Sequence, residues 1–158
     1  MPLTEISINN FRCFEGIKIS LSPGINFFYG ANGSGKTSIL EAVFIFSSGK
    51  SFKSSSLASL IKHNTNNFVL KAYDGKRGYV AEIKKDKNKS ISVELNNSKI
   101  VTSKLIKEFP CTPIHNNTFS FADASPDFRR KLLDRSIFIA EEEFSKTWFS
   151  YHLSLIHI

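Results

Sequence analysis

The stretch FYGANGSGKTSILEAVF, residues 28–44, determines the fold class of this chain. Residues 30–37 match the pattern GxxxxGK[ST] at every fixed position. An apolar run precedes the loop and a helical pattern follows it, which is the context in which this motif holds phosphate. A chance glycine turn does not account for that context. We therefore predict a P-loop nucleotide-binding fold.

Each part of this loop has a physical task. Glycines let the backbone curl so that successive N–H groups point at phosphate oxygens, and the N-terminus of the following helix favours an anion. Lys36 is expected to reach the β- and γ-phosphates of a triphosphate, and Thr37 to offer its hydroxyl to Mg²⁺. The predicted nucleotide site comprises Gly30, Ala31, Asn32, Gly33, Ser34, Gly35, Lys36 and Thr37.

The flanking sequence predicts an α/β fold. Short strands are expected over 3–8, 17–21 and 25–29, the last buried on both faces because its apolar run is unbroken. A helix is predicted over 36–47, and strand and turn patterns over 67–101 predict an antiparallel region. The excess of phenylalanine indicates a core, with the following residues expected to face it: Phe27, Phe28, Phe44 and Phe46.

Helical patterns dominate the C-terminal part. A short helix is predicted over 103–109. Ser125 as N-cap and Pro126 at the first helical position predict the start of a longer helical lobe, with an interruption near Ser136. We therefore divide the chain into residues 1–124, which contain the P-loop, and residues 125–158.

The charge of the chain favours polyanionic partners. Its formal net charge is +7, from 21 Lys and Arg residues against 14 Asp and Glu residues. Basic side chains concentrate over 84–89 and 129–131. The start lacks a secretory signal pattern, the longest apolar run is too short to span a bilayer, and two isolated cysteines are typical of a reduced compartment. We expect a cytoplasmic protein without a membrane partner.

Four stretches carry a resemblance to a known family. They are INNFRCF from residue 8, GANGSGKTSILEAVF from residue 30, GKSFKSSSLASLIKHN from residue 49 and SPDFRRKLLD from residue 125. Together they span nearly the whole chain and resemble the N-terminal portion of the RecF family of bacterial DNA replication and repair proteins. This family belongs to the SMC-like branch of the ABC-type ATPases.

The resemblance implies the head of an ABC-type ATPase, with a mixed sheet, an antiparallel β subdomain and a helical lobe. It implies ATP and Mg²⁺ as ligands, and a homodimer that closes on ATP and clamps single-stranded or double-stranded DNA without sequence preference. Recombination mediator proteins would be its partners. By the same resemblance Arg12 would lie near the bound nucleotide. The alternative for Arg12 is an ordinary exposed arginine in a turn.

Some features of the family pattern are missing. Where the family has Pro-Glu-Asp, this chain has Asn116-Asn117-Thr118. No apolar strand ending in Asp-Glu and no LSGGQ-like signature is found in the sequence, and hydrolysis needs an acidic Mg²⁺ ligand and a group that positions water. Family members are also more than twice as long, so the chain resembles a portion truncated inside the helical lobe. We expect ATP binding without turnover, and assign no catalytic residue.

Two other functions are compatible with the loop itself. A small P-loop phosphotransferase acting on a metabolite would use the same motif, although the hairpin pattern over 67–95 disfavours it, because such kinases alternate strands with helices. An inert fragment is the third possibility. The lysines over 84–89 are explained either by DNA backbone contacts or by solvation of a hairpin tip.

Overall fold

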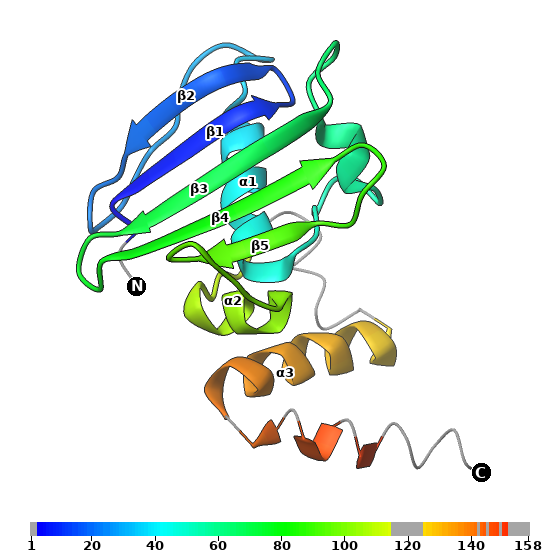
Figure 1. The fold of residues 1–158 in the computed structure, drawn as a ribbon. Coiled ribbons are helices and arrows are strands. Elements are labelled where there is room, and N and C mark those ends of the chain that lie inside the picture. The colour runs from blue at the N-terminus through cyan, green and yellow to red at the C-terminus, as the bar shows by residue number, and fades with distance from the viewer. Residues whose placement is uncertain (1–2, 115–124, 142, 145, 149, 152–158) are drawn as a thin grey trace. The chain divides into compact units, whose positions relative to one another are not determined.

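The computed structural model describes residues 3–114, 125–141, 143–144, 146–148 and 150–151. The chain divides into two compact units, Met1–Thr112 and Pro113–Ile158 (Figure 1). The elements are β1 (Glu5–Phe11), β2 (Phe14–Ser20), α1 (Lys36–Ser48), the 3₁₀ helix η1 (Leu57–Leu60), β3 (Asn67–Asp74), β4 (Tyr79–Asp86), β5 (Ser92–Leu95), β6 (Ser98–Lys99), α2 (Thr102–Glu108) and α3 (Pro126–Ala140). The division of the chain at residue 124 stays a prediction.

The first unit is built on one antiparallel sheet, with the strands in the order β2-β1-β3-β4-β5-β6. Along β3, every second side chain is buried, as the two-residue period of a strand requires. Its Leu70 lies opposite Ile8 of β1 and Ile83 of β4, so that the buried positions of neighbouring strands share one face. The antiparallel region predicted over 67–101 is confirmed.

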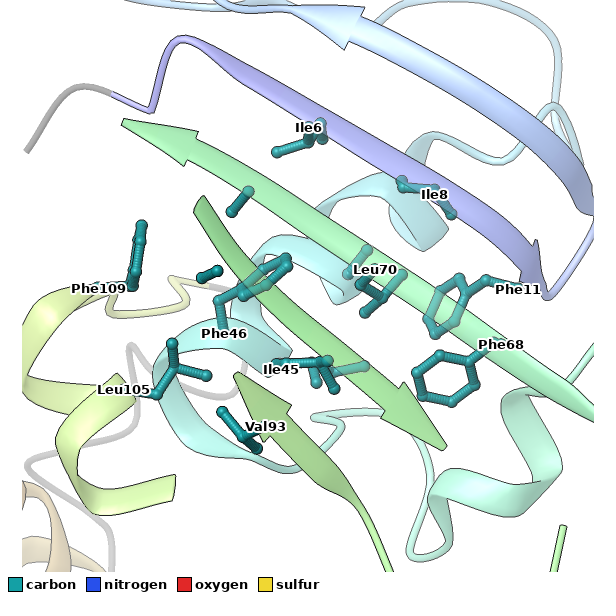
Figure 2. Close-up of a cluster of buried hydrophobic side chains, with 14 of the residues drawn as sticks. Ile6, Ile8, Phe11, Ile45, Phe46, Phe68, Leu70, Val93, Leu105 and Phe109 are labelled. Atoms are coloured by element: carbon teal, nitrogen blue, oxygen red, sulfur yellow. The ribbon is translucent and has the colours of Figure 1, made fainter. Parts of the chain in front are cut away.

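Helices α1 and α2 cover the apolar face of this sheet (Figure 1). Ile39, Ala42, Ile45 and Phe46 of α1 are buried, at the three- and four-residue spacing of a helix stripe. Phe11 and Phe68 meet edge to face in the same core (Figure 2), with ring centroids 5.2 Å apart. Burial of each such side chain contributes about 1.5 to 3 kcal/mol, so this core fixes α1 against the sheet.

The strand predicted over 25–29 is not formed. Ile25, Phe27 and Tyr29 are 78, 82 and 93% exposed, while Phe28 packs against the core. A strand needs a hydrogen-bonded neighbour, and among the described residues no strand pairs with this segment. Every pairing between the described strands is antiparallel, whereas a mixed sheet was expected. The expectation that Phe27 faces the core was wrong.

The second unit contains α3. This helix begins at Pro126, with Asp127 in its first turn, as the sequence predicts. The predicted interruption near Ser136 is wrong, because α3 continues to Ala140 and the Ser136 hydroxyl donates to the Leu132 carbonyl oxygen without breaking the helix. The segment Asn116-Asn117-Thr118 lies outside the described residues.

Candidate nucleotide-binding site

The predicted phosphate loop connects the exposed 25–29 segment to α1. Gly30, Gly33 and Gly35 have φ angles of 146°, 84° and 94°. Glycine adopts this region without the steric cost that a Cβ carries, which explains the three glycines of the motif. The backbone of the loop therefore has the tight curl that presents N–H groups to an anion.

Helix α1 begins directly after the loop. Gly35 is the N-cap and provides no side chain to cap the first N–H groups. These N–H groups and the positive end of the helix dipole favour negative charge at this point. The Lys36 ammonium lies over the loop and donates to the carbonyl oxygens of Gly30 and Ala31, at 2.9 and 2.7 Å.

The turn between β1 and β2 packs tightly on the loop at Gly35. A Cβ at this position would overlap the ring of Phe14 and lie 3.0 Å from Cys13 Sγ. At Gly33, by contrast, nothing lies within 4 Å of an added Cβ. Gly35 is thus required for both its conformation and the approach of the turn, whereas Gly33 is required for its conformation only.

A pocket of about 430 Å³ opens at this loop. Three of its lining residues are cations, from the β1–β2 turn, the loop and the segment after α1, and none is acidic. A second pocket, of about 280 Å³, has no charged lining residue. The first pocket therefore suits a phosphate group better than the second. The first pocket is lined by Arg12, Cys13, Asn32, Gly33, Gly35, Lys36, Thr37, Ser38 and Lys53.

Arg12 is held in place from two sides. Its φ is 54°, in the left-handed region that non-glycine residues rarely adopt, and its N–H donates to the Leu60 carbonyl oxygen at 2.7 Å. Its guanidinium donates from Nε and Nη2 to the two oxygens of Glu41, at 3.0 and 2.9 Å. Such a backbone conformation persists only where surrounding contacts determine it.

The structure brings most of the predicted site residues together. Arg12, Asn32, Gly33, Gly35, Lys36 and Thr37 line one pocket. Gly30 and Ala31 contribute their carbonyl oxygens to Lys36, and the Ser34 N–H closes the loop on Ala31 at 3.3 Å. The sequence prediction missed Lys53 as a lining residue and Glu41 as the partner of Arg12. Lys53 lies in one of the four stretches that carry the family resemblance, which was the available signal.

Thr37 is the candidate Mg²⁺ ligand. Its side chain is exposed at the pocket. Within the described parts of the chain, no group of three His, Cys, Asp or Glu residues could hold a metal ion. Mg²⁺ in nucleotide sites commonly takes one or two protein ligands together with phosphate oxygens and water, so a single hydroxyl beside a phosphate pocket fits that chemistry.

Comparison with known proteins shows the family of this chain. Residues 1–154 match the model of the AAA ATPase domain family. The DNA replication and repair protein RecF of Actinobacillus pleuropneumoniae is 36% identical over 153 residues, which cover 94% of this chain and 42% of RecF. The chain belongs to the AAA ATPase domain family. It spans less than half the length of the curated relatives that it matches.

Solved structures agree with this assignment. A structure of the recombination mediator protein RecF with ATP superposes with a TM-score of 0.84 at 25% identity, covering 96% of this chain and 43% of that one. A structure of an SMC ATPase gives a TM-score of 0.66 at 21% identity, covering 84% of this chain and 98% of that one, and shows the fold alone. The predicted ABC and SMC-like P-loop fold is confirmed.

The described helices include none that is both long and apolar enough to cross a bilayer.

Proposed function

We propose that this chain binds MgATP at the phosphate loop and is the nucleotide-binding part of a RecF-type DNA replication and repair ATPase. The observation that carries the proposal is the convergence on one pocket of Lys36, Arg12 and a loop of left-handed glycines at the start of α1. Each of these features stabilises negative charge, and together they match a triphosphate better than a single phosphate. Thr37 would supply the Mg²⁺ ligand.

The sheet after α1 disfavours the phosphotransferase alternative. From β3 to β6 the chain forms consecutive antiparallel strands without an intervening helix. A metabolite kinase would instead continue to alternate strands with helices. The strand order therefore disfavours a metabolite kinase.

DNA is the proposed macromolecular partner. The proposal includes an ATP-dependent homodimer that clamps single-stranded or double-stranded DNA without reading its sequence, together with recombination mediator proteins in the cytoplasm. It is supported by the RecF relatives and by the net charge of +7. The proposed phosphate contacts are the lysines of residues 84–89, which comprise the end of β4 and the turn after it and which we call the basic turn, namely Lys84, Lys85, Lys87 and Lys89.

Calorimetric titration of the chain with MgATP tests the nucleotide assignment. Lys36→Ala removes a charge that faces the phosphates, so the dissociation constant should rise about tenfold or more, equivalent to roughly 1.4 kcal/mol. Lys50→Ala is the matched control, because Lys50 is an exposed lysine outside the pocket lining. Equal MgATP affinity of wild type and Lys36→Ala would refute the assignment.

A further inference from the structure

A second loop lies at the same end of the sheet as the basic turn. Residues 61–66, which we call the connecting loop, join η1 to β3. Because β3 begins beside the end of β4, the connecting loop and the basic turn share that end of the sheet (Figure 1). The Lys87 N–H donates to the Asn66 carbonyl oxygen at 3.0 Å, which joins the two segments directly. The connecting loop therefore brings its own lysine, Lys62, to this end of the sheet.

Hydrogen bonds define the backbone of the connecting loop. The Lys62 N–H donates to the Asn10 carbonyl oxygen of β1 at 2.8 Å. The Thr65 hydroxyl donates to the Lys62 carbonyl oxygen at 2.8 Å. Asn64 has a φ of 64°, a left-handed conformation that asparagine tolerates in turns. The position of the Lys62 backbone is thus fixed relative to the sheet.

The Lys62 ammonium lies in an ion pair at the surface. It contacts a carboxylate oxygen of Glu15, on β2, at 3.4 Å. The Lys62 side chain is 30% exposed, so much of its apolar stem is covered, whereas the Glu15 side chain is 89% exposed. An ion pair with such an open carboxylate contributes little to stability and is screened by salt. Another anion can therefore replace Glu15 on Lys62 at little cost.

The two ends of the sheet differ in their charge balance. The connecting loop and the basic turn together carry Lys62 and the four lysines of the turn, and Asp86 is the only acidic residue in their sequence. At the opposite end, the turn between β3 and β4 carries Arg77, whose guanidinium pairs with Asp74 and Glu108. An excess of positive charge that local acids do not neutralise attracts a polyanion. That excess lies at the end with the connecting loop.

Resting on the proposed DNA binding, we propose that the DNA surface of this chain comprises the connecting loop as well as the basic turn. Lys62 contacts a phosphate of the DNA backbone and exchanges Glu15 for that phosphate when DNA binds. Such a contact positions the DNA and reads no base. Glu15 is an internal competitor of the DNA: it occupies Lys62 in the free protein and is released to solvent in the complex.

The lysine is tested by fluorescence anisotropy of the 158-residue chain with a short labelled DNA duplex. Lys62→Ala should raise the dissociation constant by about twofold to fivefold at physiological salt and make the log–log salt slope shallower by about 0.9, the loss of one phosphate contact. Lys76→Ala is the matched control, because Lys76 is an exposed lysine in the turn at the opposite end of the sheet. Equal effects of the two substitutions would overturn the proposal.

The exchange of Glu15 has a separate readout, a gain of affinity that damage to the fold cannot produce. Glu15→Gln should lower the dissociation constant for DNA by about twofold to threefold in wild type, because Lys62 is freed, and should have little effect in the Lys62→Ala background. Glu5→Gln is the matched control, because it removes the same charge from a pair with Lys18, at the other end of β1. An equal gain from Glu15→Gln in both backgrounds would reflect net charge alone and would refute the exchange.

The outcomes separate this proposal from the one on which it rests. If the wild-type chain does not bind the duplex even at low salt, the proposed DNA binding fails, and the role of the connecting loop fails with it. If wild type binds, the alanine variant of the basic turn binds more weakly, and Lys62→Ala behaves like Lys76→Ala, the proposed DNA binding stands and the role of the connecting loop is refuted.

Discussion

The phosphate loop and the basic turn at residues 84–89 both present lysines to solvent, but they are built differently. At the loop, Lys36, Arg12 and Lys53 come from three segments and meet at one pocket. At the basic turn, closely spaced residues of one hairpin supply the charge, and the Lys85 ammonium already donates to the backbone carbonyl oxygen of Lys89. No described pocket includes a residue of this turn.

This difference separates a site from a charged surface. The loop depends on backbone conformation, close packing and a buried carboxylate, so a small change there should have a large effect. The turn depends on net charge alone, so each lysine should matter little and its effect should vanish with added salt.

Gly35→Ala should produce the largest loss. The added methyl group meets left-handed strain and the ring of Phe14, so stability should fall by about 2 to 4 kcal/mol and MgATP binding with it. Gly33→Ala is the matched control, because it meets the strain without the overlap and should cost only about 1 kcal/mol of stability. Urea unfolding of both variants measures the difference. Equal losses would show that the turn does not pack on the loop as described.

Low pH should destabilise the hairpin between β3 and β4. There the pKa of the buried Asp74 is lowered, chiefly by the hydrogen bond from Arg77 Nε at 2.7 Å. Arg77 also contacts Glu108 of α2 at 2.6 Å, so this hairpin is tied to a helix, unlike the basic turn.

The sign of the pH dependence follows from that lowered pKa. Asp74 stabilises the fold above its ordinary pKa of 3.8, and this stabilisation is lost as the pH falls below 3.8 through the lowered folded-state pKa. Thermal melts of wild type and Asp74→Asn should therefore differ at neutral pH and converge as the pH falls below 3.8. A difference that persists at the acid end would contradict the role of this carboxylate.

Replacing the four lysines of the basic turn should produce the smallest effect. Non-specific DNA binding by the chain is expected with a dissociation constant of roughly 10⁻⁴ to 10⁻⁶ M at physiological salt. The association constant should fall as salt rises, with a log–log slope of about −0.9 per neutralised phosphate. The alanine variant at 84, 85, 87 and 89 should bind more weakly and with a shallower slope. Fluorescence anisotropy at several salt concentrations measures both. An unchanged slope would place DNA elsewhere.

Local rules made the phosphate loop predictable. Glycine positions, the lysine and the threonine are fixed by the backbone of one turn, so the sequence pattern contains the geometry. The start of α3 was predictable for the same reason, because Ser125 and Pro126 are local signals. In each case the residues that determine the structure are neighbours in the chain.

Long-range pairing explains what could not be predicted. The apolar run over 25–29 was recognised, but its assignment as a strand depended on neighbours that the pattern does not contain, and Phe27 and Tyr29 are exposed. Glu41 has the appearance of an ordinary polar residue of an amphipathic helix. Its buried pairing depends on Arg12, 29 residues earlier, and on the hydroxyl of Ser51, 10 residues later, which contact it only in the folded chain.

The most direct test of the central claim is a crystal structure of the chain with Mg²⁺ and a non-hydrolysable ATP analogue. We expect the triphosphate in the loop at the start of α1, with Lys36 moved from the carbonyl oxygens of Gly30 and Ala31 to within about 3 Å of phosphate oxygens. An analogue bound at any other place, with Lys36 still on those carbonyl oxygens, would contradict the account.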